Sequence, residues 1–336
     1  MAHAPSISTH VIRPRLPVWA INGSLTVLIL ALWPADRFLQ RYMDPYYLRI
    51  LNLVGINIVL ASSLNLINGI TGQFSLGHAG FMAVGAYVAG SAMAHYRLDG
   101  WNESFAFLAL LIAAGLVAAV VGLVVGLPAL RLRGDYLAIA TLGFGEIIYT
   151  IINATEKIGT FDIGGASGLH NIPQTTNFFW IYAAVIVCIV AVWRLAYSTK
   201  GLAFRAVRED EIAAGAMGID TTYHKAVAFA VGAFFAGVAG GLQACYDGNL
   251  APESFRFIKS IEIVVMVVLG GSGSITGAIA AAIILTWLPE QLRPFKDWRM
   301  IVYSLGLILM MILRPAGLMG GREIWFPRRR VVAKKT

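Results

Sequence analysis

Long apolar runs alternate with short polar connections along most of the chain. A helix that crosses a membrane needs about 20 predominantly apolar residues, and this pattern predicts about ten membrane segments, some of them short, broken or re-entrant. We expect them at Leu16–Trp33, Tyr46–Ile67, Gly72–Ala94, Phe105–Leu130, Tyr136–Ala154, Phe178–Tyr197, Ala226–Tyr246, Ile258–Leu269, Ser274–Leu288 and Met300–Leu313. The predicted fold class is therefore an all-α polytopic membrane protein.

Small residues crowd two of these segments, Gly72–Gly90 and Gly232–Gly241. Small side chains let helix backbones approach closely inside lipid, where packing replaces the hydrophobic effect. Glycine-interrupted segments also break, re-enter and line substrate paths, and the sequence alone does not separate these roles. The halves Tyr46–Ala154 and Ala226–Leu313 each contain such an interrupted region, which leaves an internal repeat open.

Composition supports the membrane assignment. Hydrophobic residues make up 58% of the 336 residues and charged residues 13%, whereas a soluble domain carries about 25% charged residues. The net charge of +8 comes from basic residues at the two ends and in short loops. This placement is typical of the basic cytoplasmic faces of a protein embedded in lipid and argues against nucleic-acid binding.

Counting Lys and Arg along the alternating connections predicts the topology. We expect a cytoplasmic N-terminal tail over residues 1–15, a transmembrane domain over 16–314 and a basic cytoplasmic tail over 315–336. The same count places Ser198–Lys225, the longest charged interval between two apolar segments, on the cytoplasmic side.

The charged interval Ser198–Lys225 contains signals for two short helices, near Leu202–Arg208 and Glu211–Met217. The acidic residues 209–211 precede the second helix, where carboxylates suit the positive end of the helix dipole. Gly218 follows that helix, where a left-handed residue is needed. From the residues alone, this interval is either a solvated loop with helix-supporting pairs such as Arg205 with Glu209 or a docking knob.

Ionisable groups inside apolar segments are costly unless they are paired or hydrated. Glu146 and Glu262 are candidates either for substrate contact or for bonding to the backbone amides of a broken helix. His78 is either a hydrogen-bonded structural residue or a proton relay. Cys188 and Cys245 lie within apolar runs and are expected to be buried thiols.

Several motifs are absent from the sequence. It contains no G-x-x-x-x-G-K-[ST] phosphate loop, no H-E-x-x-H, no Cys-x-x-Cys and no G-x-S-x-G elbow. We therefore expect no enzymatic activity, no cofactor or metal bound by this chain, and no ATP bound by this route.

Four motifs and the C-terminal ending resemble the LivM-type permease of branched-chain amino acid ABC importers. They are Gly69–Gly90, Arg133–Ile148, Ser198–Leu242 and Phe257–Gly277, with Leu313–Leu318 as the ending. The resemblance implies a bacterial inner-membrane protein that pairs with a second, related permease. It further implies two separate ATP-binding cassette subunits that use ATP, and an extracytoplasmic binding protein that delivers leucine, isoleucine or valine. Relatives that carry urea, short amides or other amino acids leave the substrate open.

The same resemblance implies roles for two sets of residues. The ATPase-coupling set is Arg205, Arg208, Glu209, Asp210, Glu211, Gly215 and Gly218. The translocation-path set is Gln73, Ser75, His78, Thr141, Glu146, Glu262, Gly270 and Gly271. An ion-coupled secondary transporter using Glu146, Glu262 or His78 is the rival hypothesis, and a membrane-embedded enzyme is a third, for which no catalytic constellation is present.

Overall fold

A computed structural model describes residues 18–96, 101–132, 134–295, 298–314, 316–320 and 323. Helices form most of it, in the order α1 (Val18–Tyr42), α2 (Pro45–Asn65), α3 (His78–His95), α4 (Trp101–Ala129), α5 (Asp135–Ala154), α6 (Phe178–Ala196), α7 (Thr199–Glu209), α8 (Glu211–Ala216), α9 (Thr221–Asp247), α10 (Phe257–Gly270), α11 (Ile275–Gln291) and α12 (Trp298–Leu313). Short elements complete it: the π-helical turn η1 (Leu66–Ile70), the hairpin β1 (Lys157–Ile158) and β2 (Phe161–Asp162), and the 3₁₀ turns η2 (Gly165–Ser167), η3 (Pro252–Phe255) and η4 (Arg293–Phe295).

Five helices in the described part of the chain are long and apolar enough to cross a membrane. They are Pro45–Ile70, Ser104–Ala129, Asp135–Ala154, Phe178–Ala196 and Thr221–Asp247, while α11 is a shorter apolar helix. The prediction of a polytopic, all-α membrane protein is confirmed. The N-terminal tail (residues 1–15) and most of the C-terminal tail (residues 315–336) lie outside the described residues.

The first predicted segment ends too early. We expected a polar connection from Pro34 to Pro45, but α1 continues through it to Tyr42. Its polar side chains are satisfied along the helix: the Arg37 guanidinium lies 4.1 Å from the Trp33 ring centre, and Gln40 donates to Asp36 over 2.9 Å. Because these polar side chains pair with residues one turn away on the same helix, the helix continues where a loop was predicted.

The third predicted segment, Gly72–Ala94, starts too early, because residues 72–77 are not helical and α3 begins at His78. Polar side chains replace the missing helical bonds. The Asn68 amide pairs with the backbone of Ser75 in both directions, at 3.3 and 3.1 Å, and Leu76 N–H donates to Thr141 Oγ1 over 3.0 Å. A non-helical stretch at membrane depth requires such partners.

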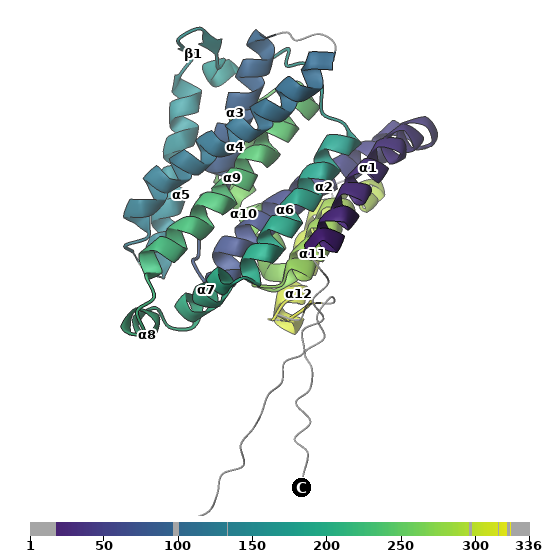
Figure 1. Cartoon of the computed structure of the whole chain (residues 1–336). Coiled ribbons are helices and arrows are strands. Elements are labelled where there is room, and N and C mark those ends of the chain that lie inside the picture. Colours follow the sequence, from purple (N-terminus) through teal and green to yellow (C-terminus); the bar gives the residue numbers. More distant parts are fainter. Residues whose placement is uncertain are drawn as a thin grey trace, which may run out of the picture.

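Helices α3 and α9 form the centre of the molecule, with α4 packed beside α9 (Figure 1). The small residues allow this contact: a Cβ on Gly85 would collide with the carbonyl oxygen of Gly237, and one on Gly240 would collide with that of Met82. The two glycine-rich segments are thus used for close helix packing. Figure 1 also shows α5 and α6 on opposite sides of this centre, with β1 at one end of the molecule and α8 at the other.

The two halves of the chain contain the same order of elements, but their corresponding helices run in opposite directions. In the first half a long helix (α2) is followed by an irregular stretch and then α3, α4 and α5; in the second, α9 is followed by η3 and then α10, α11 and α12. Helix α9 packs on α3 and α4, and α2 packs on α10 and α11. Helix α3 ends beside the hairpin, with His95 and Phe161 ring centres 5.3 Å apart, whereas α10 ends near Arg208 at the α8 end. This arrangement is an inverted repeat.

Candidate coupling knob and charged face

Helices α7 and α8 form a knob between α6 and α9, and both were predicted from the sequence. Helix α7 begins at Thr199, before the predicted start at Leu202, because Ser198 Oγ caps it by accepting from Gly201 N–H over 3.3 Å. Asp210 caps α8 by accepting from the N–H groups of Ile212 and Ala213 at 2.8 and 3.0 Å. Gly218 has a φ of 82°, which confirms the left-handed residue past the end of α8.

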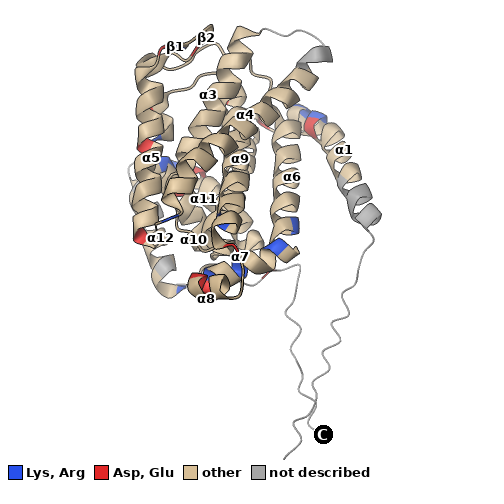
Figure 2. Ribbon diagram, turned by 60° about the vertical axis from the view of Figure 1, so that its left-hand side comes forward, with Lys and Arg blue, Asp and Glu red and all other residues tan. Residues whose placement is uncertain are grey.

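The knob exposes large apolar side chains outside the apolar spans. Leu202, Ile212 and Met217 are 63%, 71% and 83% exposed, and the acids Glu209 and Asp210 are exposed beside them. Figure 2 shows charged residues gathered on α7 and α8 at this end of the molecule. Exposed apolar groups rimmed by charge are typical of a surface that docks a protein partner.

The knob is fastened to α9 by an ion pair. Lys225 Nζ lies 2.6 Å from Glu211 Oε1, with the Lys225 side chain only 6% exposed and that of Glu211 26%. Arg205, which helix spacing pairs with Glu209, instead donates to the carbonyl oxygen of Ala196 over 3.4 Å and lies 5.1 Å from the Tyr197 ring centre. Of the expected coupling residues, Arg205 and Glu211 therefore fasten the knob to neighbouring elements. Glu209, Asp210 and Gly215 are exposed, and a Cβ added to Gly215 would meet open space.

Arg208 joins the knob to the two broken regions of the fold. Its Nη1 donates to the carbonyl oxygen of Gly69 over 2.6 Å, and a Cβ on Gly273 would stand 2.7 Å from the same nitrogen. Asn65 links the same two regions, since its Oδ1 accepts from Gly273 N–H at 2.9 Å and its Nδ2 donates to Ser274 O at 3.1 Å. Arg208 and Asn65 therefore connect α7, η1 and the α10–α11 turn by direct contacts.

The α10–α11 turn contains Gly270 and Gly271, both expected on the path and both buried. The C-terminal segment covers it: Leu318 N–H donates to Leu269 O over 2.8 Å and Met319 N–H to Gly270 O over 3.2 Å. Glu323 closes the other side by accepting from the N–H groups of Ile275 and Thr276 at 2.6 and 3.3 Å. Glu323 was not predicted from the sequence, because a capping residue 48 positions away in the chain leaves no local signal.

Four other expected path residues lie in the interior. His78 Nε2 is 2.9 Å from Ser63 Oγ, and Thr141 holds Leu76 in place. The Ser63 hydroxyl also lies 3.0 Å from Leu60 O, to which it can donate. Within the part of the chain that the structure describes, the Gln73 amide and the Ser75 hydroxyl have no hydrogen-bond partner. These residues form the buried support of the α3 start.

Glu146 and Glu262 instead lie on an open face made by α5 and α10. Glu146 Oε1 accepts from Phe257 N–H over 2.9 Å, so it bonds the first amide of a broken helix, one of the two roles expected for it. Glu262 pairs with Lys259 at 3.2 Å, and its side chain is 53% exposed. The Arg256 guanidinium lies 5.5 Å from the Tyr149 ring centre on the same face.

The depth of this charged face follows from helix geometry. Glu146 stands about 16 Å from Asp135 along α5, at a rise of about 1.5 Å per residue, which is half of a hydrocarbon core about 30 Å thick. A charged side chain facing lipid at that depth costs about 2.5–3.5 kcal/mol. Water or protein must therefore cover this face. Arg256 and Lys259 were not predicted from the sequence, although Arg256, Lys259 and Glu262 follow one another at intervals of three residues at the edge of an apolar run.

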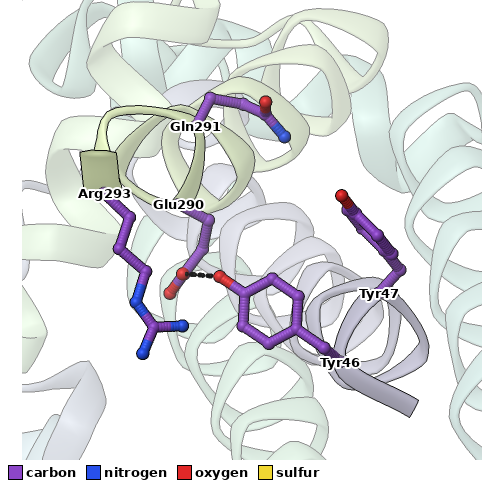
Figure 3. Close-up of a pocket in the computed structure, with 5 residues that line it drawn as sticks. All are labelled: Tyr46, Tyr47, Glu290, Gln291 and Arg293. Carbon is purple, nitrogen blue, oxygen red and sulfur yellow. Dashed lines mark hydrogen bonds between the residues drawn. The ribbon is translucent and has the colours of Figure 1, made fainter. Parts of the chain in front are cut away.

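A shallow pocket lies between the start of α2 and the end of α11, lined by Tyr46, Tyr47, Glu290, Gln291 and Arg293 (Figure 3). The Tyr46 hydroxyl donates to Glu290 Oε2, and the Arg293 guanidinium lies 5.4 Å from the Tyr46 ring centre. The pocket contains none of the expected path residues. Its polar contacts tie α2 to α11 at the end opposite the knob.

Comparison with known proteins gives a consistent result. A family model described as the permease component of branched-chain amino acid transport systems matches residues 46–313. The high-affinity branched-chain amino acid transport system permease protein LivM of Salmonella typhimurium is 35% identical over 92% of this chain and 79% of its own length. LivM of Escherichia coli is 37% identical over 80% and 69%, and LivH of Escherichia coli is 26% identical over 79% and 92%. No solved structure matches the chain at a significant level.

Proposed function

The chain belongs to the family of permease components of branched-chain amino acid transport systems, and from that premise we propose that it forms one half of the channel of an ATP-driven importer. The proposed cargo is leucine, isoleucine or valine. The other half is a second, related permease, a proposal supported by the similarity of this chain to relatives of both the LivM and the LivH kind.

The importer contains further subunits in this proposal. Two ATP-binding cassette subunits bind and hydrolyse ATP at the α8 end, which faces the cytoplasm together with both termini, and this chain itself binds no cofactor. A binding protein delivers the amino acid at the opposite, extracytoplasmic end. The membrane is the bacterial inner membrane, whose lipid covers the outward apolar surfaces such as that of α4.

The knob is the proposed docking site for an ATPase subunit. Exposed Ile212 and Met217 offer an apolar anchor, and Glu209 and Asp210 offer a charged rim. Hot spots of protein interfaces combine such a buried anchor with a polar rim. Because α8 is also fastened to α9 through Glu211 and Lys225, movement of the docked subunit acts on the core and not on a loose loop.

The contact between Arg208 and Gly69 carries this proposal. Closure of the ATPases displaces α7, and Arg208 pulls on η1 and presses on the α10–α11 turn, which are the two places where the spans are broken. Broken helices of an inverted repeat are the elements that move in alternating access. The knob thereby opens and closes the path in step with ATP hydrolysis.

In this proposal the path runs along the charged face of α5 and α10, against the second permease, with Glu146 and Glu262 on its wall. Gln73, Ser75, His78 and Thr141 stand behind that wall and hold the start of α3. Gly270 and Gly271 form the hinge at the cytoplasmic end, where the α10–α11 turn meets Arg208.

The test reconstitutes the two permeases, the ATPases and the binding protein in vesicles. Ile212→Asp with Met217→Asp is expected to abolish copurification of the ATPase and ATP-driven leucine uptake, whereas Ile158→Asp, which alters a similarly exposed isoleucine at the opposite end, leaves both intact. Wild-type copurification and uptake by the knob variant would contradict the docking role. Uptake that stops when the proton gradient is dissipated while ATP remains would instead favour an ion-coupled transporter, and transport of urea in place of leucine would correct the cargo.

A further inference from the structure

We infer that Arg256, Lys259 and Glu262 of α10 form a half-way station for a zwitterionic α-amino acid, a role that rests on the proposed function. Arg256 and Glu262 are exposed and Lys259 is half-buried. Arg256 and Lys259 lie at the start of α10, where Glu146, near the middle of α5, holds the first amide, and Glu262 follows about 7.5 Å further along the helix at a rise of about 1.5 Å per residue. Charges of both signs on one exposed face beside the apolar span α5 suit a polar occupant.

The two charges of the occupant match the two signs of this face. The carboxylate of an amino acid suits the guanidinium of Arg256 and the ammonium of Lys259, since guanidinium and ammonium groups form the stronger, charge-assisted hydrogen bonds. Its ammonium group suits Glu262. Among the described residues no carboxylate lies within ion-pair distance of Arg256, whose guanidinium instead lies over the Tyr149 ring.

The ion pair between Lys259 and Glu262 sets the strength of the station. At 3.2 Å it is formed when the station is empty. Binding of an amino acid therefore breaks this one ion pair and forms two others, one with each charged group of the ligand. Such an exchange gives little net affinity, which suits a site that must release its cargo. Glu146 acts as a positioning residue, since its carboxylate holds the start of α10.

The surroundings of the charges favour an apolar side chain. Ile258 and Ile261 on α10 and Ile147 on α5 are 58%, 41% and 52% exposed on this part of the molecule. A branched aliphatic side chain beside them removes apolar surface from water. Charged or strongly polar side chains gain nothing there, so the station fits the branched-chain class.

The first arm of the test asks whether the face is wet. In the assembled complex, Glu262→Cys is expected to react with a membrane-impermeant cationic thiol reagent, whereas Val120→Cys, 60% exposed on α4, stays unmodified in lipid. The native Cys188 and Cys245 are buried and give little background. An unreactive Glu262→Cys would overturn the inference.

The second arm measures leucine uptake and ATP hydrolysis stimulated by the leucine-loaded binding protein. Lys259→Gln and Glu262→Gln are each expected to lower uptake at least about tenfold, the loss of one charge-assisted bond, while stimulated hydrolysis stays near wild type. The exchange Lys259→Glu with Glu262→Lys keeps both signs and is expected to recover uptake. Glu253→Gln, which changes an exposed charge on η3, is the matched control.

The outcomes separate the two claims. Wild-type uptake by Lys259→Gln and Glu262→Gln would overturn the station even if the face is wet, and so would an equal loss of hydrolysis and uptake that the charge exchange fails to recover. If the unmodified complex takes up no amino acid, the proposed function fails, whatever the variants show.

Discussion

Arg208 Nη1 donates a hydrogen bond to the carbonyl oxygen of Gly69 across 2.6 Å, although the two residues are 139 positions apart in the chain. One end of this bond belongs to a helix outside the membrane spans and the other to the π-helical turn that ends α2. It therefore connects the knob, which we propose as the docking site of an ATPase, to a break inside the spans.

Replacing Arg208 by alanine is expected to uncouple the importer. Without the guanidinium, movement of α7 no longer reaches Gly69, so ATP hydrolysis continues while leucine uptake falls at least about tenfold, as for the loss of a charged hydrogen bond. Parallel measurement of both rates in vesicles checks this. Arg205→Ala, on the same helix, removes contacts with Ala196 and the Tyr197 ring but none with Gly69, and it should preserve the ratio of uptake to hydrolysis; an unchanged ratio in Arg208→Ala would contradict the link.

Gly273→Ala should disturb the position of Arg208 from the side of the α10–α11 turn. Gly273 has a φ of 90°, where an L side chain costs about 1–2 kcal/mol, and its new Cβ would meet the Arg208 guanidinium at 2.7 Å. We expect a lower Tm in detergent together with partial uncoupling. Gly306→Ala on α12 is the control, because this helical glycine has open space around it and alanine there gains up to about 1 kcal/mol; equal losses in both variants would rule out the contact of Gly273 with Arg208 as the cause.

Glu211 and Lys225 are expected to contribute to the free energy of unfolding as a coupled pair. Removing one partner of a fully buried pair costs about 3–5 kcal/mol, and Glu211→Gln should cost less than this because its side chain is a quarter exposed. Replacing both residues, with Glu211→Gln and Lys225→Met, should recover most of the loss, since no buried charge is left alone. Thermal unfolding of the two single variants and the double variant measures this; additive losses would show that the pair is not coupled.

Glu323→Ala should loosen the start of α11. The carboxylate accepts from two backbone N–H groups and from the Thr276 hydroxyl over 2.9 Å, and loss of such a cap costs about 0.5–2 kcal/mol. Hydrogen exchange of the Ile275 and Thr276 amides should accelerate, with Glu323→Gln intermediate because it retains an acceptor. Glu156→Gln, an exposed acid at the other end, should leave these amides unchanged, and unaltered exchange in Glu323→Ala would refute the cap.

The sequence predicted the features that local chemistry controls. The apolar runs identified the long spans, and Asp210 and Gly218 marked the two ends of α8. The start of α3 was missed because residues 72–77 are apolar enough to continue a helix, and only Asn68 and Thr141 show what holds them out of one. Arg208 was named for a surface role, yet its partner is Gly69, a backbone carbonyl that no side-chain pattern marks.

The bonds from Glu323 to α11 also bear on the order in which the chain is made. A polypeptide leaves the ribosome from its N-terminus, so the amides of Ile275 and Thr276 are synthesised long before the carboxylate that accepts from them, 47–48 residues later. Unpaired amides are expensive in lipid. The cap on the first amides of α11 therefore cannot form until translation has passed Glu323.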